Sequence, residues 1–183
     1  FYVGSIQKAR GVLDILTAAE ALKDNNQNDF KIELVGNIDS SLSHLREEID
    51  QREISENINL VGHISHQEVL NRMANVDVCL CVLSPKVRNY KYTYPIKLFE
   101  YMAMEKAIVC TDLPGTRHII NDGENGFLVP PDDPDALFKS LQALFDNPRL
   151  KSKLGNKAKE DVSDYEWDKI NSKIVKRIKS IDS

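Results

Sequence analysis

The fold is decided by the stretch Pro95-Ile-Lys-Leu-Phe-Glu-Tyr-Met-Ala-Met-Glu-Lys-Ala-Ile-Val-Cys-Thr-Asp112. Its first half predicts a helix, because proline suits a helix start and apolar residues then recur at helical spacing. Ala107–Thr111 predicts a short strand buried in a parallel sheet. A helix that leaves a loop presents free N–H groups and a partial positive charge, which suit a phosphate. Glu100, about one turn in, could accept hydrogen bonds from vicinal hydroxyls. The alternative is a helix that only covers the sheet, with Glu100 solvated.

The rest of the chain alternates between short apolar runs, which predict strands, and amphipathic segments, which predict helices. The predicted strands are Phe1–Gly4, Phe30–Gly36, Ile58–Gly62, Asp77–Leu83 and Phe127–Val129. The predicted helices are Gly11–Lys23, Ser40–Glu53, Ser65–Met73, Ala136–Phe145, Arg149–Val162 and Asp164–Ile181. This order predicts one α/β domain over residues 1–183, a three-layer sandwich with about six parallel strands and helices on both faces.

Length and composition describe an ordinary globular protein. The chain has 183 residues, of which 42% are hydrophobic and 28% charged, and this suits one domain with a sizeable core. No apolar run is long enough to span a membrane. The net charge of −4 means that any anion site must be local rather than spread over the surface. Because the chain opens directly on a predicted strand, we expect it to be a piece of a longer protein.

Neither the cysteines nor the acidic residues form a metal-ligand pattern. Cys79 and Cys81 are two apart in a predicted strand and face the same side, and Cys110 lies in the next strand. They lack the spacing and histidine partners of a zinc site, so we expect buried thiols in a reducing cytoplasm. Asp133-Pro134-Asp135 has the Asp-x-Asp spacing of a metal motif, but Asp133 as a helix cap before Pro134 accounts for it and is the favoured interpretation. We therefore expect no metal.

The turn after the first strand offers a candidate phosphate contact. A glycine at a strand end, here Gly4, lets a phosphate approach the backbone. The spacing from Gly4 to Gly11 is not a Gly-x-Gly-x-x-Gly fingerprint, so this signal alone is weak. Arg10 could grip two phosphate oxygens with its fork of N–H groups. The alternative is that Arg10 is a solvated loop charge.

The loop Ser84–Tyr94 is both basic and aromatic. No acidic residue occurs between Asp77 and Glu100. The loop lies at the predicted carboxyl edge of the sheet, where open α/β folds bind ligands. Basic residues interleaved with aromatic ones could also bind single-stranded nucleic acid, but one short loop makes that interpretation less favourable. The other alternative is that the loop binds nothing and is mobile and solvated. The loop carries Lys86, Arg88, Tyr90, Lys91, Tyr92 and Tyr94.

Three stretches, in this order, resemble the donor-site signature of the retaining glycosyltransferases of the GT-B type, family 4. The first is Tyr2-Val-Gly4 leading to Arg10-Gly11-Val-Leu-Asp. The second is Lys97-Leu-Phe-Glu100-Tyr-Met-Ala followed by Lys106-Ala-Ile-Val-Cys-Thr-Asp112. The third is Asn121-Asp-Gly-Glu-Asn-Gly126-Phe-Leu-Val-Pro-Pro-Asp-Asp-Pro134-Asp-Ala-Leu. The resemblance runs from the first residue to about Leu154 and implies the second, donor-binding domain of a fold built from two Rossmann-like halves.

The resemblance also implies roles for individual residues. No catalytic residue is assigned here, because the acceptor site and any general base would come from the missing N-terminal domain. A nucleotide sugar is implied as substrate, without a metal cofactor. The implied contacts are Gly4, Ser5, Arg10, Lys97, Leu98 and Phe99 to the donor diphosphate, Glu100 to the ribose, His63 and Ile64 to the nucleobase, and Tyr92 and Tyr94 to the donor sugar.

Two positions depart from the family pattern. Ser5 stands where the family usually has an arginine for the diphosphate. Tyr92 stands eight positions before Glu100, where most members have a glutamate that contacts the donor sugar. A different sugar, or a loss of activity, would each explain the second change.

The resemblance thus implies a hexosyltransferase that moves a sugar from a nucleotide-diphosphate sugar to an acceptor with retention. The expected setting is bacterial cell-surface polysaccharide synthesis in the cytoplasm, with no nucleic-acid partner. An isolated donor domain is expected to be inactive. Peripheral contact with the inner face of the membrane is left open, as is a crossing of the 164–181 helix toward the missing domain. The alternatives are a non-catalytic nucleotide- or partner-binding module and, with a poorer fit to the element order, a nucleotide-sugar epimerase.

Overall fold

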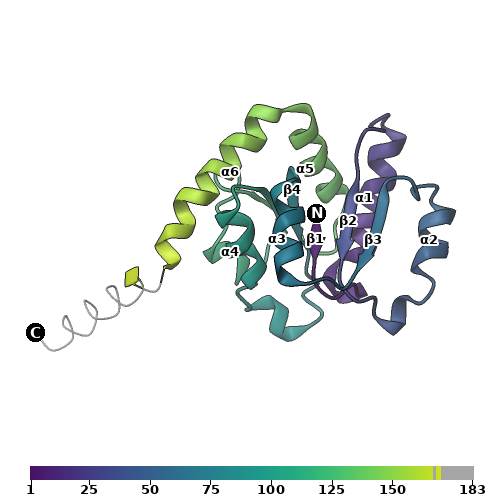
Figure 1. Cartoon of the computed structure of the whole chain (residues 1–183), viewed down its shortest axis with the longest axis horizontal. Coiled ribbons are helices and arrows are strands. Elements are labelled where there is room, and N and C mark those ends of the chain that lie inside the picture. The colour runs from purple at the N-terminus through teal and green to yellow at the C-terminus, as the bar shows by residue number, and fades with distance from the viewer. Residues whose placement is uncertain (167, 170–183) are drawn as a thin grey trace, which may run out of the picture.

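A parallel sheet of six strands runs through the centre of the computed structural model, which describes residues 1–166, 168 and 169 (Figure 1). The chain fills one half of the sheet from β1 outward to β3, and then returns to place β4 on the other side of β1. This reversal between β1 and β4 is the topological switch point at which open α/β sheets bind ligands. In spatial order the strands are β3 (Ile58–Gly62), β2 (Ile32–Val35), β1 (Tyr2–Val3), β4 (Val78–Cys81), β5 (Ala107–Thr111) and β6 (Phe127–Val129).

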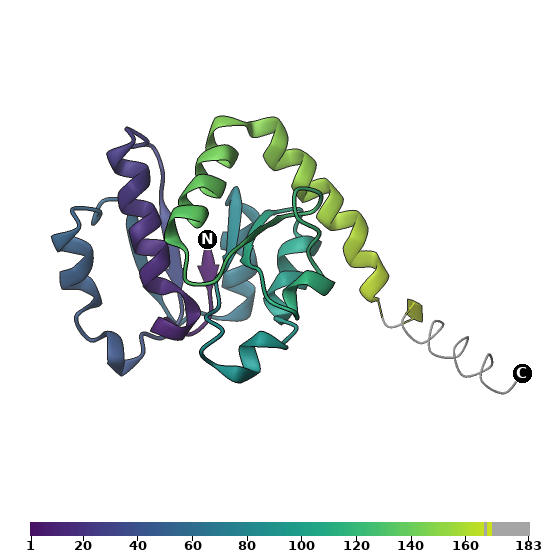
Figure 2. The same cartoon turned by 180° about the vertical axis from the view of Figure 1, so that it is seen from behind.

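Helices cover both faces of the sheet, as Figures 1 and 2 show from opposite sides. One face packs against α1 (Val12–Asp24), α2 (Leu45–Gln51) and α5 (Pro134–Asp146). The other packs against α3 (His66–Ala74) and α4 (Ile96–Ala103), with α6 (Pro148–Val162) lying along α4 and β5. The predicted three-layer α/β sandwich is therefore confirmed. Five short 3₁₀ helices complete the described chain: η1 (Lys8–Arg10), η2 (Ser40–Leu42), η3 (Arg88–Lys91), η4 (Thr116–His118) and η5 (Ser163–Tyr165).

The single helix predicted over Ser40–Glu53 is wrong. The segment instead forms η2, and α2 begins only at Leu45. The Asp39 carboxylate accepts a hydrogen bond from the Ser41 N–H at 2.9 Å. Asp39 thus caps a helical turn that begins at Ser40, where the helix was expected, but this turn ends at Leu42, and Ser43 and His44 form a turn before α2. The helix predicted over 164–181 opens with η5, and residues 170–183 lie outside the described part of the chain.

The predicted cap at Asp133 and the predicted buried thiols are confirmed, and α3 has a similar cap. Ser65 caps α3 by accepting from the Glu68 N–H at 3.3 Å, and Asp133 caps α5 by accepting from the Ala136 N–H at 2.9 Å. All three cysteines are free and buried, and burial raises the pKa of Cys79 to about 11. A thiol with that pKa stays protonated at neutral pH, which suits a packing role.

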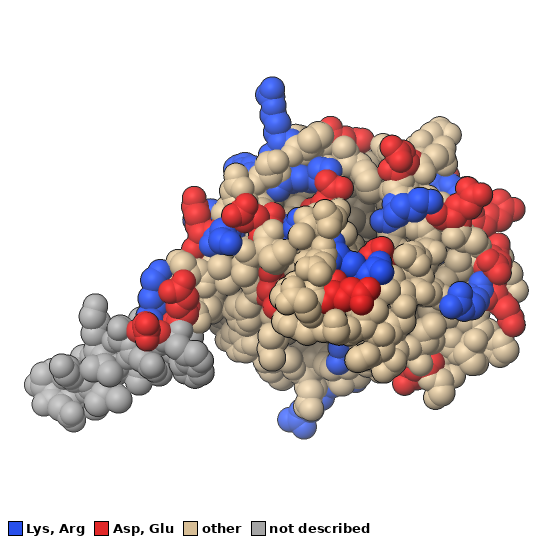
Figure 3. Space-filling view, viewed as in Figure 1, with Lys and Arg blue, Asp and Glu red and all other residues tan. Residues whose placement is uncertain are grey.

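The surface carries both signs of charge. On the face shown in Figure 3, lysine and arginine side chains are interspersed with aspartate and glutamate. Within the described residues, no helix combines the length and apolar character needed to cross a bilayer. The described residues also contain no group of three or more histidine, cysteine, aspartate or glutamate side chains placed to hold a metal ion.

The α6 helix lies unusually close to the chain between α4 and β5. A Cβ atom at Gly155, inside α6, would stand 2.2 Å from the carbonyl oxygen of Glu105. Real Cβ atoms do not come this close to backbone, so the glycine is what allows α6 to pack here.

We predict that Gly155→Ala destabilises the chain by about 1–3 kcal/mol, although glycine to alanine inside a helix is ordinarily stabilising. Urea unfolding measures the change. The control is Asn156→Ala on the exposed side of the same turn, which should be neutral or stabilising by up to ~0.7 kcal/mol. A stabilising Gly155→Ala would contradict the close packing of α6.

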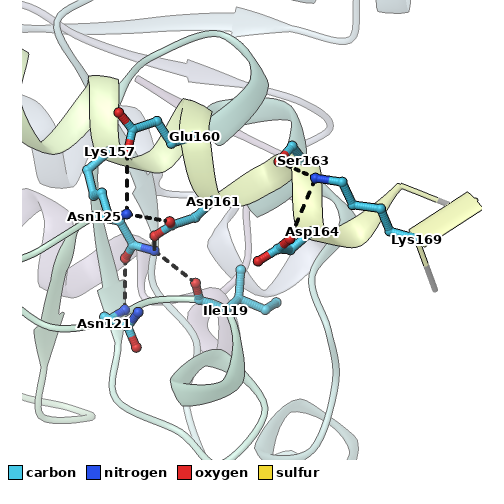
Figure 4. Close-up of polar contacts among 9 residues, drawn as sticks. All are labelled: Ile119, Asn121, Asn125, Lys157, Glu160, Asp161, Ser163, Asp164 and Lys169. Atoms are coloured by element: carbon cyan, nitrogen blue, oxygen red, sulfur yellow. Dashed lines mark hydrogen bonds and ion pairs between the residues drawn. The ribbon is translucent and has the colours of Figure 1, made fainter. Parts of the chain in front are cut away.

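A buried asparagine ties the turn before β6 to α6 (Figure 4). The Asn125 amide donates to the Ile119 carbonyl at 3.2 Å and to the Asp161 carboxylate at 2.8 Å. Its own side-chain oxygen accepts from the Asn121 N–H at 2.8 Å. This part of the third sequence stretch is therefore a structural lock that holds α6 against the sheet.

We predict that Asn125→Ala lowers the free energy of unfolding by about 1–3 kcal/mol, because it leaves buried polar groups without partners. The matched control is Asn121→Ala, which removes an exposed side chain of the same turn and should change little. Equal effects of the two variants in urea unfolding would contradict the lock.

Candidate functional site

A pocket of about 460 Å³ opens at the carboxyl ends of β1, β2 and β3. Three loops that follow parallel strands meet at this edge, so residues far apart in sequence line the same cavity. The pocket is lined by four of the residues that the resemblance assigns to the donor site. It is also lined by a glycine of the loop after β2 and by the first residue of α3. These lining residues are Gly4, Ser5, Gly36, His63, Ile64 and His66.

Two glycines bring the β1 and β2 loops into direct backbone contact. A Cβ atom at Gly36 would stand 1.9 Å from the carbonyl oxygen of Gly4. Both residues have positive φ, +136° for Gly4 and +143° for Gly36, a region that side chains rarely enter. The turn after β1 therefore exposes bare backbone at the pocket.

Two cations from distant parts of the sequence converge on that backbone. A Cβ atom at Gly4 would lie 3.1 Å from Nη1 of Arg10 and 3.3 Å from Nζ of Lys97. Lys97 reaches across from α4, donates to the Val3 carbonyl at 2.8 Å and lies 4.3 Å from the centre of the Tyr2 ring. Among the described carboxylates, none forms a salt bridge with Arg10 or Lys97.

The electrostatics of this pair favour an anion. Burial lowers the pKa of Lys97, and the charge of Arg10 contributes in the same direction. Two like charges beside exposed backbone repel each other, and a multivalent anion between them would relieve that repulsion. The turn after β1 is thus a candidate site for a phosphate-type anion.

A tyrosine from the basic loop fixes Arg10 in place. The Tyr90 hydroxyl accepts from Nε of Arg10 at 3.2 Å and from the Gln7 amide at 3.3 Å, and its ring lies 5.4 Å from the guanidinium carbon. The Arg10 guanidinium is therefore fixed by Tyr90 and is not a freely solvated loop charge. No local pattern reveals this contact, because 80 positions separate the two residues.

The side chains of Leu98 and Phe99, in the first turn of α4, serve packing. Pro95 is the residue that precedes the helix, and no side chain caps this end. Leu98 is fully buried, and the Phe99 ring lies 4.9 Å from the ring of Tyr165. The N–H of Leu98 already donates to the Pro95 carbonyl at 2.9 Å. Their side chains are therefore not available to a ligand, and the Leu98 N–H could reach one only by sharing or leaving its bond to Pro95.

Glu100 is already partnered in the absence of a ligand. Its Oε1 lies 2.9 Å from Nε2 of His66, the first residue of α3 and a lining residue of the pocket. The Glu100 side chain is 28% exposed and that of His66 is 68% exposed. The sequence patterns assigned Glu100 to the site but missed His66. The two residues are 34 positions apart, so no local pattern connects them.

Tyr92 and Tyr94 lie on the β5 side of the site rather than in the pocket. They are 61% and 50% exposed. The ring of Tyr94 stacks on His118 with 6.0 Å between centroids and 18° between planes. A Cβ atom at Gly115 would stand 2.3 Å from the Thr93 carbonyl oxygen, so this loop packs directly on the loop after β5.

The candidate contacts thus fall into three zones along one sheet edge. His63 and Ile64 follow β3, the paired cations surround the turn after β1, and the two exposed tyrosines pack toward β5. The fold and this arrangement define a Rossmann-like ligand-binding domain with a cationic centre.

The chain belongs to the family described as glycosyl transferases group 1, whose family model matches residues 1–161. It is 26% identical over 176 residues to phosphatidyl-myo-inositol mannosyltransferase of Mycolicibacterium smegmatis, covering 96% of this chain and 43% of that protein. It is 24% identical over 183 residues to an α-1,4-N-acetyl-D-galactosaminyltransferase of Campylobacter jejuni, covering 98% and 47%. The chain therefore spans about half the length of the curated relatives it matches.

Solved structures confirm the fold as one half of a GT-B architecture. Anabaena HepE in complex with UDP superposes with a TM-score of 0.81 at 16% identity, over 98% of this chain and 48% of HepE. The C-terminal domain of the group 1 protein LpcC from Francisella tularensis gives 0.74 at 22% identity, over 88% of this chain and 82% of that domain. Further HepE structures hold UDP-glucose, or UDP and glucose.

We predict that pyrophosphate binds at the Arg10–Lys97 pair and that Lys97→Met weakens it by about tenfold or more, since a charged hydrogen bond is lost. Because burial lowers the pKa of Lys97, a bound anion should raise it again, and binding at alkaline pH should take up protons. Calorimetry in buffers of different ionisation enthalpy measures both effects.

The control is Lys91→Met, which removes an exposed lysine of η3 without touching the pair. Lys97→Met should abolish the proton uptake and Lys91→Met should not. Unchanged affinity and unchanged proton uptake in Lys97→Met would contradict an anion site at this pair.

Proposed function

We propose that this chain is the donor-binding domain of a glycosyltransferase and holds the nucleotide-diphosphate part of a nucleotide sugar. One observation carries the proposal: Arg10 and Lys97, without carboxylate partners among the described residues, both approach the bare backbone of Gly4 at the switch point of the sheet. Family membership and the UDP complexes of a structural neighbour support the choice of ligand.

The order of the three zones along the sheet edge supports a ligand of this kind. A nucleotide sugar has its base, ribose, diphosphate and sugar in that order. His63 and Ile64 would meet the base, Glu100 the ribose hydroxyls, and the cations the diphosphate. Tyr92 and Tyr94, on the far side of the cations, would meet the sugar.

The remaining residues that the resemblance assigns to the diphosphate have smaller proposed roles. Ser5 lines the pocket beside Gly4, and Leu98 and Phe99 would contribute only backbone groups at the start of α4.

The proposed chemical role is to stabilise the departing nucleoside diphosphate. Negative charge builds up on the diphosphate as its bond to the sugar breaks, and fixed cations stabilise that charge. A hydrogen bond to a charged group contributes roughly 1.5–3 kcal/mol, and a helix N-terminus roughly 0.3–2 kcal/mol. Arg10, Lys97 and the start of α4 together would supply this stabilisation from the chain's own residues.

The whole protein would transfer the sugar with retention at the anomeric carbon. The acceptor site and any general base would belong to an N-terminal domain, so this chain alone would not turn over. Cytoplasmic synthesis of a bacterial cell-surface polysaccharide, with contact to the inner face of the membrane, is the proposed setting. Tyr92 in place of the usual acid favours one second candidate, a non-catalytic module that binds a nucleotide without transferring a sugar.

We predict that one of UDP, GDP and ADP binds this chain in a calorimetric titration and that Glu100→Gln weakens its binding about tenfold, because the ribose hydroxyls lose a charged acceptor. Glu124→Gln is the control, since Glu124 is exposed in the turn before β6, outside the pocket. The proposed donor site is wrong if none of the three nucleotides binds. It is also wrong if Glu100→Gln binds the nucleotide as tightly as Glu124→Gln does.

Donor hydrolysis by the full-length protein separates the two candidates. A transferase should release the nucleoside diphosphate from its donor slowly in the absence of an acceptor, and Arg10→Gln should reduce this release. Nucleotide binding without hydrolysis or transfer of any tested UDP-, GDP- or ADP-sugar would favour the non-catalytic module.

A further inference from the structure

We propose that His66 is a positioning residue that holds the Glu100 carboxylate in the orientation required to bind a ribose, and thereby sets the preference for ribose over 2′-deoxyribose. This inference rests on the proposed function, because it assigns a role within the same donor site. It concerns a residue that neither the sequence patterns nor the helix periodicity single out.

The contact joins side chains from two different helices, α3 and α4. His66 is the first residue of α3, directly after its cap Ser65, and Glu100 lies in the second turn of α4. Nε2 of His66 and Oε1 of Glu100 are 2.9 Å apart. Because His66 lines the pocket beside His63 and Ile64, the carboxylate is held at the edge of the cavity in which the base would lie.

The pair is poorly placed to serve stability. His66 is 68% exposed, and exposed ion pairs contribute little to folding because water and salt screen them. The Glu100 side chain, at 28% exposure, would otherwise sample several rotamers. Holding it in one of them before the ligand arrives removes that ordering cost from binding.

The hydrogen-bonding capacity of the carboxylate fits this arrangement. An ionised carboxylate offers about four acceptor positions, and His66 occupies one of them on Oε1. The remaining positions can accept the two hydroxyls of a ribose, whereas a 2′-deoxyribose would leave one unused. If the carboxylate were free to rotate, the site would lose its preference for ribose over 2′-deoxyribose before it lost nucleotide binding altogether.

The test compares affinities for UDP and dUDP, GDP and dGDP, and ADP and dADP by calorimetric titration of the 183-residue chain. The expected result for wild type is tighter binding of the ribonucleotide of one pair. His66→Ala should weaken that ribonucleotide about two- to tenfold and change its deoxy counterpart little. His66→Gln keeps a donor at this position and should restore most of the discrimination.

A double-mutant cycle shows whether His66 acts through Glu100. In a Glu100→Gln background, His66→Ala should have little further effect on the ribonucleotide. Gln67→Ala is the matched control, because it alters the next residue of the same helical turn, whose side-chain amide donates to Asn71 at 3.3 Å and does not line the pocket. This control should bind all six nucleotides as wild type does.

The outcomes separate this inference from the function it rests on. If no ribonucleotide binds the wild-type chain, the proposed donor site fails and the role of His66 fails with it. If a ribonucleotide binds but His66→Ala weakens the ribonucleotide and its deoxy counterpart equally, the donor site stands and the positioning role is overturned. The same conclusion follows if His66→Ala weakens the ribonucleotide as much in the Glu100→Gln background as in wild type.

Discussion

The site depends on one contact between backbones, where Gly36 lies against the carbonyl of Gly4. A Cβ atom at residue 36 would stand 1.9 Å from that oxygen, so no other residue fits without moving one of the two loops. The contact holds the turn after β1 at the centre of the sheet edge, with its backbone uncovered. Arg10 and Lys97 can then approach the same backbone from η1 and α4. The cationic centre is thus a consequence of how tightly the first two strands are joined.

Each functional side chain around this centre is held by a partner from another element. Tyr90 holds Arg10, the Val3 carbonyl holds Lys97, and His66 holds Glu100. The helices and strands of the domain fix these partners, so the site is organised before any ligand arrives. Preorganised charge of this kind is what stabilises a leaving group most effectively, because little reorganisation remains at the moment of reaction. The two exposed tyrosines on the β5 side, by contrast, leave the proposed sugar end of the site more open.

Sequence patterns located the strands well because short apolar runs bounded by turn residues leave a strong local signal. Ile58–Gly62, Ala107–Thr111 and Phe127–Val129 have the observed bounds, and the predicted alternation produced the right layers. The helix predicted over Ser40–Glu53 starts at a capped turn as expected but is interrupted at Ser43 and His44, a break that the apolar periodicity does not report. Ordered motifs pointed to Gly4, Arg10, Lys97 and Glu100, which the fold does bring to one edge. Their partners Tyr90 and His66 were beyond prediction, since contacts across dozens of residues appear only once the chain is folded.

The decisive measurement is a crystal structure of this chain with whichever of UDP, GDP and ADP binds it in titration. We expect the diphosphate at the turn of Gly4, within hydrogen-bonding distance of Arg10 and Lys97. We also expect the ribose at Glu100 and the base beside His63 and Ile64. A nucleotide bound away from this sheet edge, or one whose diphosphate contacts neither cation, would contradict the account.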